Sequence, residues 1–320
     1  MRVLFVSSGN LSGNKPSTIV VNQAQSLIKQ GIEITYFTII GKGLLGYIGN
    51  VRKLKKILSE NTFDVVHAHF GFCGFVAYFA KRNEKVVVSL MGSDLLEELN
   101  ESYLGRIKDR TLIFFVKLFS RYFIDFTIVK SEGMSLKLFR NTRYAIIPNG
   151  VDFSVFFPVE KNLARKALKL ELEKKIVLFP ANKERKEKNF ALAQKAISLI
   201  NNENLILLPI HGLTQAELNL YYNASDVLLM TSIYEGSPNV IKENLACDRV
   251  IVSTDVGDVR KNFVDVDGCF ITSYNAKDIA EKICLALSIK ESNGRMKIAH
   301  LNSNLIAIKL QEIYKNLCAE

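Results

Sequence analysis

The chain has 320 residues, a hydrophobic fraction of 48% and a net charge of +10. This length and composition fit two globular domains with hydrophobic cores and exclude a disordered or fibrous protein. Its five cysteines are scattered and contain no C-x-x-C pair, which excludes a zinc or redox site of that spacing and favours a reduced, cytoplasmic protein.

The positive charge is concentrated in the N-terminal half. Residues 1–150 contain 20 Lys and Arg against 11 Asp and Glu, a net charge of +9, whereas residues 151–320 contain 22 against 21, a net charge of +1. This asymmetry indicates that the N-terminal half faces an anionic surface or substrate, either membrane phospholipid or nucleic acid. The most apolar long segment, residues 111–129, is interrupted by Lys117, Arg121 and Asp125. We therefore expect no transmembrane helix and, since the first residues lack a signal-peptide pattern, no export.

The first half alternates predicted strands and helices. Strands are expected at residues 2–7, 32–37, 64–67 and 85–90, and helices at 17–30, 72–81 and 103–123. Strand, loop, helix and strand form the βαβ unit of a parallel sheet. Gly9 and Gly13 in the first loop do not complete a G-x-G-x-x-G fingerprint, so a ligand loop and a flexible turn both stay open for them.

Two basic helices in this half have alternative interpretations. Residues 41–58 interleave apolar side chains with Arg52, Lys53, Lys55 and Lys56. This pattern predicts either an amphipathic helix that lies on anionic lipid or a crossover helix with a basic outer face. Residues 103–123 mix basic and aromatic side chains, and we favour a core helix with a basic exposed edge.

Two short patterns resemble metal ligands. His67 and His69 form an H-x-H pair at a predicted strand end, but no third ligand has a recognisable spacing, so a structural or substrate role is favoured. Asp265 and Asp267 form a D-x-D pattern before Gly268, where a turn is favoured. No metal or other cofactor is expected.

The second half starts after a predicted domain boundary at residues 145–158, AIIPNGVDFSVFFP. Strands are expected at 175–180, 205–208 and 226–230 and in the segments VIVSTDVG and DVDGCFI, with helices at 189–200, 214–222, 275–288 and 295–317. Four cations at positions 183, 185, 186 and 188 follow the first of these strands. They suit a diphosphate at the carboxyl edge of a sheet, or they form a solvated charge run.

Residues 226–257 combine a strand, a glycine-containing loop, a short helix and a further strand. Pro238 suits the start of a helix, and the N-terminus of that helix favours an anion such as a diphosphate. Glu235 lies in the loop before the helix and Glu243 lies within it, so both can reach one ligand. A capping acid and a solvated helix face are the alternative.

The segment YEGSPNVIKENLA resembles the E-x7-E segment of glycosyltransferase family 4, whose members are retaining enzymes of the GT-B fold, and the similarity continues to Arg260. The segments DVVHAHF, VVSLMGSDLL, FTIVKSEGM and PNGVDFSVFFP resemble other segments of that family. Met91 stands where the family has a histidine, so only Gly92 and Asp94 carry over at that point.

The resemblance implies an α/β, GT-B-like fold with two open parallel-sheet, Rossmann-like domains that face a cleft. Residues 1–150 would form the acceptor-side domain, 151–158 a linker and 159–295 the nucleotide-sugar-binding domain. Residues 296–320 would form a terminal helix that packs back toward the N-terminal domain.

The resemblance also implies a function. It is that of a retaining, metal-independent glycosyltransferase that moves a hexosyl or related sugar from a nucleotide-sugar donor to a saccharide or lipid-linked acceptor in cell-surface polysaccharide or glycan synthesis. Glu243 would bind the ribose of the donor and Glu235 the transferred sugar. The implied catalytic residues are Glu235, Lys188 and Arg185; the donor-binding residues are Glu243, Gly236, Ser237, Pro238, Asn239 and Lys183; the acceptor-side residues are Gly13, His69, Gly92 and Asp94.

Two other functions stay open. A non-hydrolysing sugar-nucleotide epimerase would need acid and base groups that the chain does not clearly present, and Met91 prompts the alternative of a catalytically weak sugar-nucleotide-binding protein. Nucleic-acid binding is disfavoured because no recognition helix or aromatic RNA motif is present. We expect a cytoplasmic protein whose basic half contacts the anionic inner face of the cell membrane.

Overall fold

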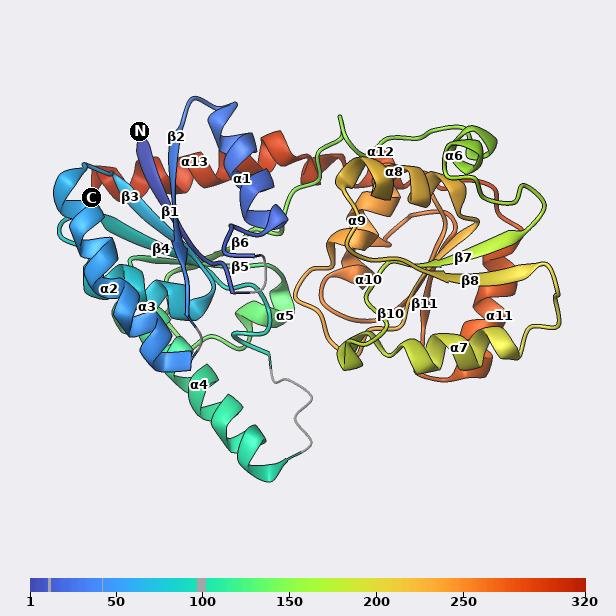
Figure 1. Cartoon of the computed structure of the whole chain (residues 1–320), viewed down its shortest axis with the longest axis horizontal. Helices are drawn as coiled ribbons and strands as arrows, with labels where there is room; N and C mark the ends of the chain where they lie inside the picture. Colours follow the sequence, from blue (N-terminus) through green and yellow to red (C-terminus); the bar gives the residue numbers. More distant parts are fainter. Residues whose placement is uncertain (11–12, 42, 97–101) are drawn as a thin grey trace. The chain divides into compact units, whose positions relative to one another are not determined.

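The computed structural model describes residues 1–10, 13–41, 43–96 and 102–320. The chain divides into two compact units (Figure 1). Residues 1–150 and 303–320 form the N-terminal unit, and residues 151–302 form the C-terminal unit. Each unit contains one parallel sheet covered by helices on both faces. The expected fold class, two parallel-sheet α/β domains, is confirmed.

The N-terminal sheet has six parallel strands in the order β2-β1-β3-β4-β5-β6. Its strands are apolar runs because both faces are buried: Val3 and Phe5 of β1 pack toward α1 and α13, whereas Leu4 and Val6 pack toward α2 and α3. The strands are β1 (Arg2–Ser8), β2 (Glu33–Ile39), β3 (Val65–His69), β4 (Lys85–Ser89), β5 (Phe126–Val129) and β6 (Tyr144–Ile146), and the helices are α1 (Thr18–Ile28), α2 (Gly43–Glu60), α3 (Gly71–Ala80), α4 (Tyr103–Tyr122), α5 (Glu132–Ser135) and α13 (Ser303–Ala319).

The C-terminal sheet has five parallel strands in the order β11-β10-β9-β7-β8. In β9, Val227 and Leu229 pack toward α7 and α11, and Leu228 and Met230 pack toward α8 and α9. The strands are β7 (Lys175–Phe179), β8 (Leu205–Pro209), β9 (Val227–Met230), β10 (Ile251–Thr254) and β11 (Cys269–Thr272), and the helices are α6 (Lys161–Ala167), η1 (Lys186–Lys188), α7 (Phe190–Ser198), α8 (Gln215–Ala224), α9 (Asn239–Ala246), α10 (Val259–Asn262), α11 (Ala276–Leu287), α12 (Gly294–Lys297) and η2 (Ala299–Leu301).

Two segments near the division between the units differ from the sequence-based expectation. Residues 151–158, expected as a linker, lie within the C-terminal unit, where Val151 and Phe156 are buried in the core. The single helix expected over 295–317 is instead α12, η2 and α13. The helix is interrupted because Asn302 pairs with Val151 in a short parallel bridge, and the chain enters the N-terminal unit directly after it.

The last helix, α13, packs against α1 and is part of the N-terminal core. The hydroxyl of Tyr314 lies 2.6 Å from Nδ1 of His67, and the Ser89 hydroxyl lies 2.8 Å from Nε2 of the same ring. Burial lowers the pKa of His67 well below its ordinary value, so the ring is neutral. The first histidine of the H-x-H pair therefore holds the terminal helix to the sheet.

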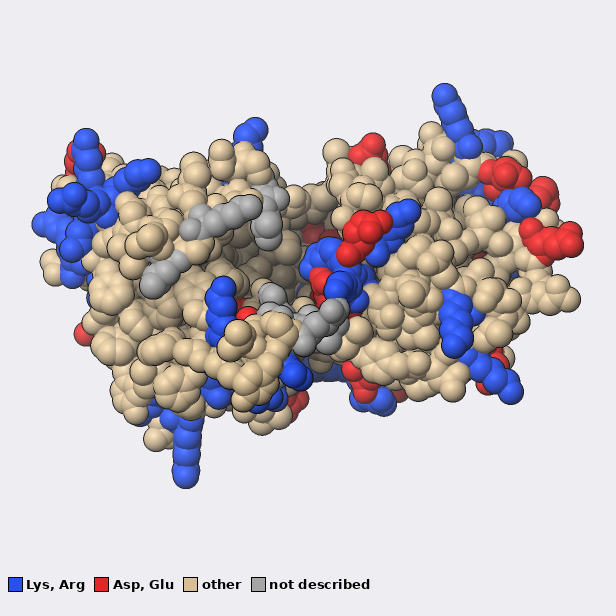
Figure 2. Space-filling view, turned by 60° about the horizontal axis from the view of Figure 1, so that its bottom comes forward, with Lys and Arg blue, Asp and Glu red and all other residues tan. Residues whose placement is uncertain are grey.

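Lys and Arg side chains gather at the left edge of the face shown in Figure 2, which belongs to the N-terminal unit. Helix α2 buries Leu54 and Leu58 in the core, and so it is a crossover helix between β2 and β3. Its outer face carries the exposed residues Arg52, Lys53, Lys55 and Lys56. No helix within the described part of the chain is long and apolar enough to span a bilayer.

The strand order reverses once in each sheet, between β1 and β3 and again between β7 and β9. At such a reversal the two adjacent strands send their following segments to opposite faces of the sheet, which leaves a crevice at the carboxyl ends where ligands of open α/β sheets bind. The fold therefore identifies the loops after β1, β3, β7 and β9 as the places to look for a site.

Candidate functional site

The loops after β7 and β9 are held against each other at the reversal point of the C-terminal sheet. The backbone N–H of Ile233 donates to the carbonyl of Glu187 at 2.8 Å, and the Thr231 hydroxyl lies 2.9 Å from the carbonyl oxygen of Lys188 and 3.0 Å from that of Asn189. Asn189 adopts a left-handed conformation (φ 54°) that ends η1 and starts α7. The η1 turn is thereby fixed beside the loop that carries Glu235.

This arrangement brings Lys188 and Glu235 together as an ion pair, although 47 residues separate them. Both side chains are largely shielded, with exposed fractions of 17% and 18%. Arg185, which is 60% exposed, pairs with Glu187, and Lys183 is exposed on the same loop. Among Lys183, Arg185 and Lys188, the contact with Glu235 is made by Lys188.

The buried side chains of Lys242 and Asp258 support the loop at the N-terminus of α9. The helix begins at Asn239 with Pro238 as its N-cap residue, so the backbone of residues 236–239 leads into the helix end. The Ser237 hydroxyl donates to Asp258 Oδ2 at 2.6 Å and accepts from Lys242 Nζ at 3.0 Å. Lys242 is fully buried, and this burial lowers its pKa. The Ser237 hydroxyl therefore links the loop to the buried side chains of Asp258 and Lys242.

The same loop is held on its other side by residues at the carboxyl ends of β10 and β11. The Thr254 hydroxyl donates to the carbonyl of Ser232 at 2.7 Å, and the Tyr274 hydroxyl lies 3.1 Å from the carbonyl oxygen of Ile233. Gly257 has φ +61°, and a Cβ at this position would lie 2.8 Å from the carbonyl oxygen of Gly236. Only glycine allows the two backbones to approach so closely.

Glu243 is fixed by a partner on a neighbouring helix. Its carboxylate accepts a hydrogen bond of 2.7 Å from the hydroxyl of Tyr222, a buried residue of α8. Burial raises the pKa of Glu243 and contributes most to the large increase in the pKa of Tyr222. The Glu243 side chain is partly exposed, but its hydrogen bond to Tyr222 fixes its orientation. Glu243 is therefore not part of a freely solvated helix face.

Sequence reasoning missed Tyr222, Lys242, Asp258 and Gly257. Lys242 gave a weak signal, since it lies four residues before Ala246 and shares its buried helix face. Tyr222 and Asp258 come from other elements of the fold, and no local pattern links them to Glu243 or Ser237.

The expected acceptor-side residues lie at the carboxyl edge of the N-terminal sheet. Gly13 is exposed after β1 with φ +63°. His69 ends β3, where its buried ring stacks on His67 with centroids 4.4 Å apart. Burial, with a smaller effect of the Lys130 charge, lowers the pKa of His69 to about 3. Nε2 of His69 has no hydrogen-bond partner among the described residues.

Asp94 holds the loop after β4. Its Oδ1 accepts from the backbone N–H groups of Met91 and Gly92 at 2.9 and 3.0 Å, and its Oδ2 accepts from Gly71 at 2.9 Å. Burial raises the pKa of Asp94 despite these bonds. Gly92 has φ +125°, which favours glycine. The structure thus brings Gly92 and Asp94 into one loop beside the start of α3.

Within the described ranges, no group of three His, Cys, Asp or Glu side chains is placed to hold a metal. Asp265 has φ 55°, and Asp267 accepts a hydrogen bond of 2.8 Å from the Asn293 amide in the turn before β11. The D-x-D pattern forms that turn.

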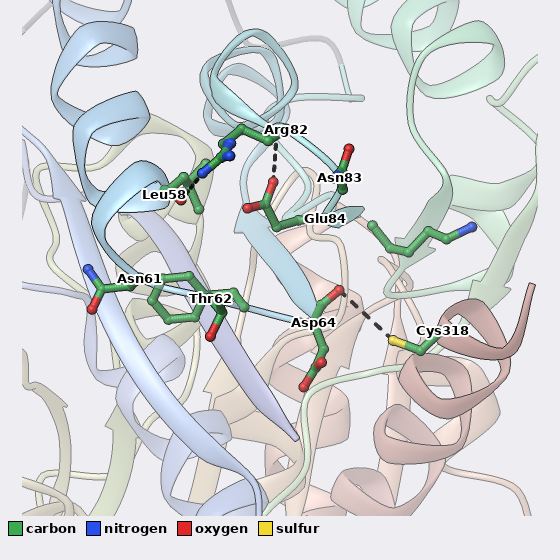
Figure 3. A pocket seen from close by; sticks show the side chains of 10 residues that line it. Leu58, Asn61, Thr62, Asp64, Arg82, Asn83, Glu84 and Cys318 are labelled. Atoms are coloured by element: carbon green, nitrogen blue, oxygen red, sulfur yellow. Dashed lines mark hydrogen bonds between the residues drawn. The ribbon is translucent and has the colours of Figure 1, made fainter.

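A cavity of about 400 Å³ lies at the amino ends of β3 and β4, and Figure 3 shows hydrogen bonds in its lining between Arg82 and Glu84 and between Cys318 and Asp64. The Arg82 backbone N–H donates to Glu84 at 2.6 Å, and the Cys318 thiol contacts the Asp64 carbonyl at 3.9 Å. The cavity is lined by none of the expected site residues and lies at the sheet edge opposite to them.

Two family profiles match the chain. Residues 17–155 match the profile described as Glycosyltransferase Family 4, and residues 207–288 match Glycosyl transferases group 1. Together the two matches span more than half of the chain. The chain belongs to glycosyltransferase family 4. No curated protein sequence matches it significantly.

Solved structures agree on the fold of this glycosyltransferase. Sucrose-phosphate synthase from Thermosynechococcus elongatus is 17% identical, with a TM-score of 0.85 and 99% of each chain covered. Anabaena HepE in complex with UDP and glucose is 15% identical, with a TM-score of 0.75 and coverage of 99% of this chain and all of that one. A UDP-forming α,α-trehalose-phosphate synthase from Burkholderia vietnamiensis is 11% identical, with a TM-score of 0.72 and coverage of 100% and 98%. The GT-B fold is shared by all three.

We predict that Gly257→Ala destabilises this glycosyltransferase more than Gly212→Ala does. Both glycines have positive φ, but a Cβ at position 212 meets nothing within 4 Å, whereas one at 257 meets the Gly236 carbonyl. The extra clash should lower the free energy of unfolding by about 1–3 kcal/mol, measured by urea denaturation. Equal denaturation midpoints for the two variants would show that the loop is not tightly held by this approach.

Proposed function

We propose that this glycosyltransferase moves a hexosyl or related sugar from a nucleotide-sugar donor to a saccharide or lipid-linked acceptor, with retention of configuration and without a metal ion. The observation that carries the proposal is the reversal point of the C-terminal sheet, where Lys188, Glu235 and the N-terminus of α9 come together. Neighbours of the same fold crystallised with UDP and with UDP-glucose support a nucleotide-sugar donor.

In the proposed donor complex, the diphosphate lies at the N-terminus of α9. The backbone N–H groups of Gly236, Ser237 and Asn239 lie at this helix end, and the helix dipole favours an anion there. Glu243 accepts hydrogen bonds from the ribose hydroxyls, because Tyr222 already orients its carboxylate. Glu235, in the loop before the helix, accepts from hydroxyls of the transferred sugar.

The proposed catalysis is electrostatic. When the bond between the sugar and the diphosphate breaks, negative charge grows on the leaving phosphate, and Lys188, Arg185 and Lys183 are the nearby cations of the η1 loop. Glu235 holds the Lys188 ammonium in position through their ion pair, so it serves both the sugar and the cation. The acceptor attacks from the face that the diphosphate leaves, which retains the configuration.

The acceptor is proposed to bind on the N-terminal unit, at the loops that contain Gly13, His69, Gly92 and Asp94. These loops follow β1, β3 and β4 at the carboxyl edge, and three backbone N–H groups bound to Asp94 fix one of them. The neutral ring of His69 is buried at the end of β3 on this edge, and its Nε2 has no partner among the described residues.

We also propose a cytoplasmic protein that docks peripherally on the inner face of the cell membrane in cell-surface polysaccharide or glycan synthesis. On α2 the exposed basic residues lie beside apolar side chains that are also exposed, Leu45 at 84% and Ile48 at 54%. Tyr47 of the same helix is partly buried, and the side chain of Leu44 lies outside the described residues. Basic and apolar groups together favour an anionic membrane surface.

We predict that Glu243→Ala weakens nucleotide binding about 10- to 100-fold, because a hydrogen bond to a charged group contributes about 1.5–3 kcal/mol. Glu235→Ala should mainly lower kcat, since its carboxylate acts on the reacting sugar. Calorimetric titration with a nucleotide and steady-state kinetics separate the two effects, with Glu281→Ala on the exposed face of α11 as control. Unchanged nucleotide affinity in Glu243→Ala would refute the assignment to the ribose.

Sugar transfer is expected to persist in excess EDTA, because side-chain cations and a helix terminus meet the diphosphate charge. Product formation is compared with and without the chelator, and then after addition of manganese. A complete loss of activity that manganese restores would contradict metal independence.

The membrane proposal predicts that wild-type protein sediments with vesicles that contain anionic lipid, increasingly so as the anionic fraction rises. Glutamate at positions 52, 53, 55 and 56 should abolish sedimentation at low salt, since each basic residue near such a surface contributes about 1 kcal/mol. The matched control carries glutamate at four exposed lysines of the C-terminal unit, Lys166, Lys169, Lys195 and Lys290. Equal sedimentation of the two variants, or none by wild type, would exclude α2 as the contact.

A further inference from the structure

An apolar cavity of about 410 Å³ opens between α2, α3 and α4 of the N-terminal unit. Its volume falls within the range of about 300–1,000 Å³ that is typical of ligand pockets. Among the described residues of its lining, Lys108 of α4 is the one with a charge, and aromatic and aliphatic side chains make up almost all of the rest. They include Ile48, Val51, Phe72, Phe75, Phe79 and Leu112. Such a lining suits an aliphatic chain.

The mouth of this cavity carries apolar side chains that remain in contact with solvent. Phe79 on α3 is 56% exposed, and Ile48 on α2 is similarly exposed. Exposed apolar side chains that surround an apolar cavity are typical of a ligand or membrane contact.

A second, smaller cavity of about 190 Å³ adjoins the first and shares Phe72, Lys108 and Leu112 with it. Its lining also includes the polar residues Ser93, Asp94 and Asp109. Asp94 belongs to the loop after β4, at the carboxyl edge of the sheet. The two cavities thus lead from an apolar mouth, past a lysine, to polar side chains at the edge proposed for the acceptor.

We infer that the two cavities bind a lipid-linked acceptor, a sugar joined through phosphate to an aliphatic chain. The chain occupies the apolar cavity, the Lys108 ammonium pairs with the phosphate, and Ser93 and Asp109 bond to hydroxyls of the sugar. The order of apolar, cationic and polar groups along the cavities matches the order of the three parts of this molecule. The inference rests on the proposed transferase function and names the class of its acceptor.

The test uses decyl phosphate, below its micelle concentration, as a probe for the chain and the phosphate. Calorimetric titration of the full chain should show binding at least tenfold tighter than that of inorganic phosphate, which lacks the chain, and of decyl glucoside, which lacks the phosphate. Val51→Trp fills the apolar cavity and Lys108→Glu reverses its charge, and each should weaken binding of decyl phosphate at least tenfold. Ser59→Trp on α2 and Arg106→Glu on α4 are matched controls at exposed positions that line neither cavity, and they should bind as wild type does.

Nucleotide binding by the C-terminal unit is measured on the same preparations, and circular dichroism with urea denaturation shows that the N-terminal unit of each variant is folded. If wild type binds a nucleotide but not decyl phosphate, or if all four variants bind decyl phosphate equally, the inference fails and the proposed function stands. If no nucleotide sugar or nucleotide diphosphate binds wild type, the proposed function fails, whatever the alkyl probe does. Weakening by Lys108→Glu alone identifies a phosphate contact without a chain site and also overturns the inference.

Discussion

The loop between β9 and α9 is held in place from two sides by hydrogen bonds to its own backbone, and the candidate donor site depends on this restraint. Ile233 bonds to the η1 turn, and the Ser232 carbonyl accepts from Thr254. Because these bonds fix the backbone, Glu235 is held beside Lys188, and the N–H groups of Gly236, Ser237 and Asn239 lie at the start of α9. The backbone of Gly257 also packs closely against the loop, at the carbonyl oxygen of Gly236.

Strands and fold class were predictable from the sequence because buried parallel strands are nearly continuous apolar runs. The strands expected at 85–90 and 226–230 agree with β4 and β9 within one residue at each end. The helix expected over 295–317 was not predictable in detail, since its interruption comes from Asn302 pairing with Val151, a contact between residues 151 positions apart. Local periodicity contains no information about such a pairing.

The candidate site also depends on contacts between residues far apart in the sequence, which local patterns do not predict. A family resemblance pointed to Glu235, Glu243 and Lys188, and the fold supplies what the sequence could not: the reversal of strand order that brings β7 and β9 together, and the Tyr222 hydroxyl that orients Glu243. Lys242 and Asp258 are ionisable groups at buried positions, where apolar residues are the usual expectation. Both are explained by Ser237, which lies between them.

The central claim, that the loop of residues 235–239 and helix α9 bind the nucleotide sugar, is tested most directly by hydrogen exchange of the full chain with and without UDP or another nucleoside diphosphate. Slower exchange is expected at the backbone amides of Gly236, Ser237 and Asn239 and in the η1 turn when the nucleotide is bound. Protection confined to the N-terminal unit, with no change at these amides, would contradict it.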